Sequence, residues 1–438
     1  MKKFLGFVIV VLLISPIIVN ADIEDNHLLD VKKADSTAIT VDKIKSIEKT
    51  EGAYGPQGFE VTDKYFIIAQ VILDGEGTVD NPILVYDKNT LEYVKTIHYN
   101  IGHGDDICYN SDTHELLFVK SHDSQTTLVV FDSDKLTFKK NIEIDPDVLT
   151  AGRGLTYNPE EKQYIMTSGT WGYIFNQDFE LQSKFDLRIR QIAQSLEFSD
   201  ENIYYSTYSY ISGEVTYQVE FESFYAVIYV FDKTGKYLHT VYIPQIGTDK
   251  VEIEGTAIDD NGDTYFVYNN YTTGKIEIYK AAYDRRNKIS FDIPISIDNK
   301  QVNNTITFNG YYKKENSTDT KKLVSKDSKF SIDIDLYFIG NEKYEIYQTN
   351  ASDNDVELDK EAIVVTVTNK YVLAKNKTIS TYELSRKQFN NSTKDISTIT
   401  NVPDTFKGRG IIGLIIGIIC IVSASIVCFP IYKKRKVN

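Results

Sequence analysis

The stretch QGFEVTDKYFIIAQ, residues 57–70, shows a pattern that returns four more times along the chain. Each copy has a polar residue, a short alternating strand, a turn rich in Asp, Asn, Ser or Gly, and an aromatic-rich strand. Such turn residues between two strands predict a β-hairpin, because they tolerate or stabilise tight bends. The other copies are DDICYNSDTHELLFV from Asp105, RGLTYNPEEKQYIMTS from Arg153, QSLEFSDENIYYSTY from Gln194 and EGTAIDDNGDTYFVY from Glu254.

Third and fourth strands follow most of these hairpins. The third ends in aspartate in ILVYDKNT (83–90), LVVFDSDK (128–135) and IYVFDKTG (228–235), and a fourth follows in EYVKTIHY (92–99). Four antiparallel strands per repeat, at a period of about fifty residues, are typical of a β-propeller blade. We therefore predict a five-bladed β-propeller over residues 43–285, because a β-sandwich would not repeat this order of strand types.

The two ends of this region complement each other. The fifth copy has a third strand in KIEIYKA (275–281) but no convincing fourth strand after it. The segment DKIKSIEKTEGAYGPQG (42–58), ahead of the first copy, resembles a fourth strand and the loop that follows it. We expect residues 44–49 to complete the last blade and fasten the ring.

The first residue of each copy is expected at one mouth of the central channel, where the innermost strands begin. Glycine or serine follows it in four of the five copies, which suits an axis where backbones approach closely. His103 precedes the second copy on the loop leading in. The candidate channel residues are Gln57, His103, Asp105, Arg153, Gln194 and Glu254.

Three interpretations of this mouth remain open. The residues could be a structural lining, with Arg153 between Asp105 and Glu254. They could bind a glycan, a peptide or another polar ligand. They could also hydrolyse a glycosidic bond, which needs two carboxyl groups, and the catalytic candidates are then Asp105 or Asp106 with Glu254. Aromatic residues that could stack on a sugar lie on nearby loops: Tyr54, Trp171, Tyr208 and Tyr210.

Other chemistry finds little support. DDNGD (259–263) has its glycine too early for a calcium loop and lacks the required glutamate, so it predicts a hairpin turn. HExxH and GxSxG motifs are absent from the sequence, and we expect no metal and no cofactor. Cys108 alternates with its neighbours on a strand and is expected in the core. The net charge of −14 without a basic stripe argues against nucleic acid as a partner.

The ends of the chain predict its location. MKKFLGFVIVVLLISPIIVNAD has the basic start, apolar run and small residues of a secretory signal peptide, assigned to residues 1–21. Residues 410–432 form an apolar stretch long enough to span a bilayer, and the basic tail at 433–438 would stay on the cytoplasmic side. We expect an exported, single-pass protein at the outer face of its membrane.

Residues 398–409 form a polar linker that contains NVPDTF. This motif, followed by an apolar span and a basic tail, resembles the sorting signal of Gram-positive surface proteins. In that family a sortase cuts a Leu-Pro-x-Thr-Gly type motif and joins the protein to the cell wall. Val402, Pro403 and Thr405 match the motif, whereas Phe406 replaces the expected glycine. A plain membrane tether is the alternative.

Residues 288–397 alternate cleanly, as in ISFDIPISI and EAIVVTVTNKYVLA, and predict a β-sandwich. The region resembles the isopeptide-type pilin domains of Gram-positive pili, in which a lysine is joined to an asparagine near a glutamate. Asn391 matches the asparagine, but Gln348 stands where the glutamate is expected and SFDIPISI holds no lysine. The resemblance therefore implies a stalk without the cross-link.

The repeats QGFEVTDKYFIIAQ and GHGDDICYNSDTHELLFV resemble secreted propeller proteins of Gram-positive bacteria, including the five-bladed helveticin-like group. That resemblance implies a link to bacteriocins and antagonism. From the whole sequence we expect a cell-surface binding or adhesion protein with a glycan or surface protein as ligand. A surface glycoside hydrolase and a bacteriocin-like protein are the alternatives, and binding is favoured over catalysis.

Overall fold

The computed structural model describes residues 29, 36–72, 79–122, 125–189, 193–209, 225–244, 246–247, 250–283, 287–302 and 305–394. The predicted signal peptide (1–21), the sorting motif with Val402, Pro403 and Thr405, and the predicted membrane span (410–432) lie outside the described residues. Within the described ranges, no helix has the length and apolar character needed to cross a membrane.

The chain divides into two compact units. The first holds the described residues up to Ile289 together with 334–342 and 366–382, and the second holds 290–333, 343–365 and the described residues from Glu383. Both are built from β-strands, and regular helix in the described ranges is limited to one short 3₁₀ turn, Leu373–Lys375.

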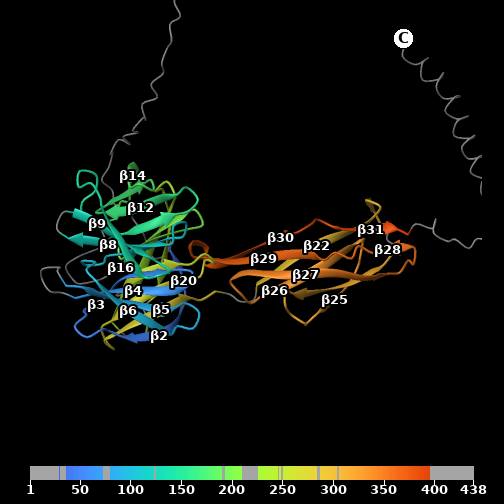
Figure 1. The fold of residues 1–438 in the computed structure, drawn as a ribbon, viewed down its shortest axis with the longest axis horizontal. Helices are drawn as coiled ribbons and strands as arrows, with labels where there is room; N and C mark the ends of the chain where they lie inside the picture. Colours follow the sequence, from blue (N-terminus) through green and yellow to red (C-terminus); the bar gives the residue numbers. More distant parts are fainter. Residues whose placement is uncertain are drawn as a thin grey trace, which may run out of the picture. The chain divides into compact units, whose positions relative to one another are not determined.

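The described part of the first unit contains five antiparallel sheets of blade type (Figure 1). Within each sheet the strands pair in chain order, except that β2 joins the last sheet and β1 (Thr37–Ala38) adds a parallel strand to the fourth. The first blade is β3 (Gly55–Val61), β4 (Tyr65–Val71), β5 (Asn81–Asp87) and β6 (Tyr93–Tyr99), and the second is β7 (Ile107–Asn110), β8 (Glu115–His122), β9 (Gln125–Asp132) and β10 (Thr137–Glu143). The third is β11 (Leu155–Asn158), β12 (Gln163–Ser168), β13 (Trp171–Phe175) and β14 (Leu181–Asp186), and the fourth is β15 (Ser195–Ser199), β16 (Asn202–Ser209), β17 (Tyr225–Asp232) and β18 (Tyr237–Ile243). The fifth is β19 (Val251–Ile258), β20 (Thr264–Asn270), β21 (Lys275–Ala281) and β2 (Val41–Glu48).

The five sheets form a closed ring. The innermost strands contact one another in the cycle β3, β7, β11, β15, β19 and back to β3. This order identifies a β-propeller with five blades among the described residues, as the repeat predicts.

The hydrophobic cores lie between neighbouring blades, and one such core separates each blade from the next. Successive residues of one strand enter different cores. In β8, Leu116 and Phe118 pack toward the first blade, whereas Leu117 and Val119 pack toward the third. Both faces of the middle strands are therefore buried, which explains their continuous apolar sequences. Cys108 lies in the core between the second and third blades, and its predicted burial is confirmed.

The predicted ring closure is also confirmed. Strand β2 pairs antiparallel with β21 from Val41 opposite Ala281 to Glu48 opposite Lys275. Ile47 enters the core that holds the first and fifth blades together, beside Phe59 and Ile276. A segment that precedes the first repeat thus completes the last blade.

The second unit contains parts of two sheets (orange to red in Figure 1). Buried residues alternate with exposed ones along β22 (Asn287–Ile297) and β26 (Lys329–Leu336) and with half-buried ones along β29 (Ile363–Val372), so each sheet has one more deeply buried face. A Cβ on Gly310 of one sheet would lie 3.0 Å from the ring of Phe330 in the other, and Asn391 accepts a hydrogen bond from the N–H of Asp359 at 2.8 Å. One sheet is β23 (Lys300–Gln301), β22 (Asn287–Ile297), β31 (Phe389–Thr393) and β28 (Val356–Glu357), with β26 (Lys329–Leu336) beside β22. The other is β25 (Lys321–Val324), β24 (Phe308–Lys314), β27 (Gly340–Ala351), β29 (Ile363–Val372) and β30 (Lys377–Leu384).

Replacing Ile47 by alanine tests the closure of the ring. The side chain is 5% exposed and belongs to the core between the first and last blades. Its removal should lower the free energy of unfolding by about 2–4 kcal/mol, because a cavity remains where the blades meet. Urea denaturation followed by circular dichroism measures the change. Glu48→Ala, on an exposed neighbour in the same strand, should change it by less than about 0.5 kcal/mol. Equal effects of the two substitutions would contradict the closure.

Candidate functional site

The inner strands approach one another closely one residue beyond the predicted channel mouth. Four of the five blades carry glycine or serine there: Gly58, Gly154, Ser195 and Gly255. A Cβ on Gly255 would lie 2.4 Å from the Cβ of Phe59, and a Cβ on Gly58 would lie 2.9 Å from the carbonyl oxygen of Gly104. The backbones therefore leave no room for larger side chains, which confirms the crowded axis expected from the sequence.

Asp106 takes the corresponding place in the second blade and is fully buried. Its Oδ2 atom accepts the N–H groups of Leu155 at 3.0 Å and Leu196 at 2.9 Å, and Oδ1 accepts that of Ile107 at 3.0 Å. One carboxyl group thus joins the inner strands of three blades. Burial raises the pKa of Asp106 well above its usual range, and these three N–H groups oppose the rise. Its hydrogen bonds give it a structural role.

The predicted mouth residues pair with one another. His103 bonds to Asp105 at 2.8 Å, and the guanidinium of Arg153 pairs with the same carboxylate oxygen. Gln57 donates to Glu254 at 3.4 Å, whereas Gln194 donates to Glu252 at 3.3 Å. Burial, followed by the charge of Glu252, raises the pKa of Glu254.

The structure therefore brings Asp105, His103 and Arg153 together in one group, and Gln57 and Glu254 in another. The structural interpretation placed Arg153 between Asp105 and Glu254, whereas the structure pairs Arg153 with Asp105 and Glu254 with Gln57. Of the aromatic candidates, Tyr54 packs edge-on against Tyr271, Trp171 lies under the ammonium of Lys184, and Tyr210 lies outside the described residues. Catalysis by Asp105, Asp106 and Glu254 stays an untested prediction.

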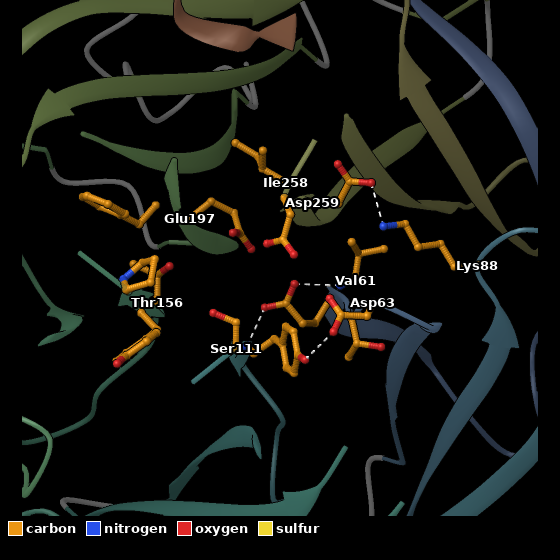
Figure 2. A pocket seen from close by; sticks show the side chains of 15 residues that line it. Val61, Asp63, Lys88, Ser111, Thr156, Glu197, Ile258 and Asp259 are labelled. Atoms are coloured by element: carbon orange, nitrogen blue, oxygen red, sulfur yellow. Dashed lines mark hydrogen bonds and ion pairs between the residues drawn. The ribbon is translucent and has the colours of Figure 1, made fainter. Parts of the chain in front are cut away.

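A cavity of about 70 Å³ lies toward the C-terminal ends of the same inner strands (Figure 2). Every blade contributes a residue to its lining from its inner strand, so the cavity belongs to the central channel. These residues are Glu60 of β3, Tyr109 of β7, Thr156 of β11, Glu197 of β15 and Ile258 of β19. We call this space the carboxyl cavity, because five carboxyl groups line it: Glu60, Asp63, Glu197, Asp259 and Asp260.

The rim of the carboxyl cavity is exposed and its floor is buried. Asp63 and Asp260 lie at the solvent side, whereas Glu60, Glu197 and Asp259 are buried. Burial, followed by the charge of Asp63, raises the pKa of Asp260. The cavity thus presents carboxyl groups from its entrance to its base.

One lysine enters this group of acids. The ammonium of Lys88 lies 2.7 Å from a carboxylate oxygen of Asp259, and Figure 2 shows it reaching across from the neighbouring blade. The same aspartate accepts the N–H groups of Asn261 at 3.0 Å and Asp263 at 2.9 Å. It thereby stabilises the turn between β19 and β20, which confirms that DDNGD forms a hairpin turn. Among the described residues, no group of three or more His, Cys, Asp or Glu side chains is placed to hold a metal ion.

The two buried glutamates differ in their partners. Glu60 accepts the N–H of Val61 at 2.7 Å and that of Tyr109 at 2.8 Å, and burial raises its pKa to about 8. Glu197 is 5% exposed, and its pKa is raised well above the usual range by burial, then by Glu60 and Asp106. The N–H of Ile258 bonds to its carboxyl group, but no described residue donates a hydrogen bond to the Oε1 atom. A buried polar atom left in this way costs free energy unless something binds it.

Sequence reasoning missed the carboxyl cavity, although a signal was present. Glu60 in QGFEVTD and Glu197 in QSLEFSD occupy the same position of two repeats, each between apolar residues. A charged residue at a buried position of a strand, present in two copies, marks a second layer of the channel. The prediction concentrated on the first residue of each repeat and left this layer out.

Two substitutions at Asp106 test its structural role. Asp106→Ala leaves three buried N–H groups without acceptors and should lower the free energy of unfolding by at least about 3 kcal/mol. Asp106→Asn keeps one acceptor oxygen and should cost less. Urea denaturation compares the two variants with the wild type. Losses below about 1 kcal/mol for both would contradict the role.

The raised pKa of Glu60 predicts a dependence of stability on pH. Between pH 4.5 and about 8 the folded protein holds a proton on Glu60 that the unfolded chain has released. Unfolding then releases a proton, so stability falls as pH rises through this window. In Glu60→Gln this contribution is absent, and the loss of stability from pH 5 to pH 8.5 should be smaller than in the wild type. Thermal unfolding across this range measures both slopes, and parallel slopes would contradict the shift.

Comparisons with known proteins give no family. No protein-family model and no curated protein matches the chain. Similar solved structures include U3-55K, at 10% identity over 51% of this chain and 77% of that chain with a TM-score of 0.33. They also include the WD40 repeats of RRP9, at 9% identity over 58% of this chain and 100% of that chain with a TM-score of 0.35. At these scores the propeller assignment rests on the strand order and pairing of this chain alone.

Proposed function

We propose that this chain is a cell-surface binding protein whose propeller holds a polar ligand in the carboxyl cavity. The observation that carries the proposal is the unpartnered Oε1 atom of Glu197 in a cavity to which all five blades contribute. A buried acceptor with no internal partner is suited to a donor that arrives with a ligand. Convergent polar groups in a concave site are the usual mark of a binding site.

Binding has more support than glycoside hydrolysis. The cavity of about 70 Å³ holds a Glu197 oxygen that accepts no hydrogen bond from any described residue, which suits a donor group of a ligand. Hydrolysis also needs one protonated and one ionised carboxyl group. Burial shifts both Glu60 and Glu197 toward the protonated form. Antagonism of the bacteriocin type rests on the sequence resemblance alone.

Surface display is the second part of the proposal. It is supported by the secretory pattern at residues 1–21, the apolar stretch at 410–432 and the motif around Thr405. The alternating burial of the second unit and the close approach of Gly310 to Phe330 support a β-sandwich spacer between propeller and anchor. The ligand would then be met outside the cell.

Adhesion of intact cells tests the proposal. Cells that produce the full-length chain should expose it to added protease and adhere to members of a panel of immobilised glycans and proteins. Glu197→Gln should reduce adhesion at least tenfold at equal surface amount, because the amide replaces one of the two carboxyl oxygens by a donor and the N–H of Ile258 uses the other. Glu48→Gln, on an exposed strand, is the matched control and should adhere like the wild type. Adhesion that is equal with and without the chain, or a chain protected from protease, would refute the proposal.

A further inference from the structure

We propose that the carboxyl cavity binds the cationic end of a basic side chain, a lysine ammonium or arginine guanidinium, inserted from a protein partner. The inference rests on the proposed binding function and names the chemistry of its ligand. Four observations support it: the free acceptor, the charge of the lining, an internal precedent and the size of the cavity.

The first support is the position of Glu197. Its carboxyl group is buried and lines the cavity, and Figure 2 shows it directed toward the space between the inner strands. Within the described part of the chain Oε1 has no donor, whereas both oxygens of Glu60 in the same layer accept N–H groups. An incoming N–H donor would complete the hydrogen bonding of the layer. Charge-assisted bonds of this type are the strong ones.

The second support is the balance of charge. Five carboxyl groups line the cavity and one lysine, Lys88, is present among the lining residues. Lys88 is bonded to Asp259 and its charge also favours ionisation of Asp260, so one lysine faces five carboxyl groups. The whole chain has a net charge of −14, which favours the approach of cations. The same lining disfavours an anionic ligand.

The third support is that the cavity already accommodates one ammonium group. The side chain of Lys88 is 15% exposed and that of Asp259 is 3% exposed, so this pair sits within the wall. A second cation would meet ligands of the same chemical type. For a divalent metal, by contrast, the described residues offer no suitable group of three ligands.

The fourth support is size. About 70 Å³ is enough for the cationic group at the end of a side chain, and the exposed rim leaves space for the stem behind it. Tyr109 and Tyr157 also line the cavity. Aromatic rings stabilise both a cation and an apolar stem, so they suit a long basic side chain.

Binding of a cation should be linked to release of protons. Glu60 is faced by Asp106 and Cys108 of the second blade, by Glu197 of the fourth and by Asp260 of the fifth. Lys88 lies at the wall of the fifth blade, on Asp259. A bound cation favours ionised carboxyl groups, whereas a lysine ammonium stays protonated up to about pH 10. Affinity should therefore rise from pH 6 to pH 8.5.

Calorimetry on the full-length chain in detergent tests the inference with four probes. They are the capped peptides Gly-Gly-Lys-Gly-Gly and Gly-Gly-Arg-Gly-Gly, the same peptide with norleucine, and the free diamine cadaverine. We expect one of the basic peptides to bind at least tenfold more tightly than the norleucine peptide. Its affinity should increase with pH, and its heat should differ between buffers of different ionisation enthalpy.

Variants assign the binding to the carboxyl cavity. Glu197→Gln should lower the affinity for the basic peptide at least tenfold, and Glu48→Gln should leave that affinity unchanged. If Glu197→Gln fails to fold by circular dichroism, Asp260→Asn at the exposed rim replaces it, with an expected loss of at least threefold. Equal binding of basic and norleucine peptides, or no effect of the cavity variant, overturns the inference. If cadaverine binds as tightly as the best peptide, the inference that the cation comes from a protein partner is overturned.

The two proposals fail in different ways. If adhesion depends on Glu197 but no cationic probe binds, the inference of a cationic ligand is refuted and the proposed binding function is retained. Peptide binding without adhesion by intact cells refutes surface binding and leaves the cation site standing.

Discussion

The stability of the ring depends on which acceptors bond to the N–H groups along the unpaired edges of its innermost strands. Each inner strand pairs with one neighbour in its own blade, and its other edge faces the axis of the ring. N–H groups on that edge need acceptors, because buried donors without partners are costly. Asp106 supplies them for the third and fourth blades, and Glu60 supplies one for the second. Carboxyl groups in the channel are therefore part of the fold.

The same requirement creates the candidate site. A glutamate that accepts an N–H group from the next blade has two carboxyl oxygens. The backbone around it does not always donate a hydrogen bond to both. Glu60 bonds to Val61 of its own strand and to Tyr109 of the next blade, whereas Glu197 bonds to Ile258 and its Oε1 accepts from none of the described residues. The candidate binding group, Glu197, is thus also a structural residue. The surrounding carboxyl groups and Lys88 determine which ligand charge the cavity favours. Stability and binding depend on the same layer of side chains.

The sequence was informative where its pattern is local and repeated. The hairpin copies predicted the blades, the strand before the first copy predicted the closure with β21, and Asx-type turn residues predicted the β19–β20 hairpin. Side-chain pairs across the channel were harder to predict from the sequence. An alignment of the repeats shows how far along the channel a residue lies, but not which residue it bonds to. Arg153 was expected between Asp105 and Glu254, whereas the structure pairs Arg153 with Asp105 and Glu254 with Gln57. Residues 366–382 group with the propeller, although they alternate like the strands around them. Alternation shows which side of a strand is buried, and it does not show which unit covers that side.

Closure by β2 has a consequence for the order of folding. Val41 pairs with Ala281, so the last blade needs two segments from opposite ends of the propeller sequence. During synthesis, β2 waits without its partner until β21 has been made, and its ladder groups and Ile47 stay available to other strands. Contacts at such separation in sequence slow folding and lengthen exposure to misassembly. The ring closes in a late step, when β2 pairs with β21. Chaperones and protein concentration should therefore affect the yield of folded protein more than they do for a domain built from local contacts.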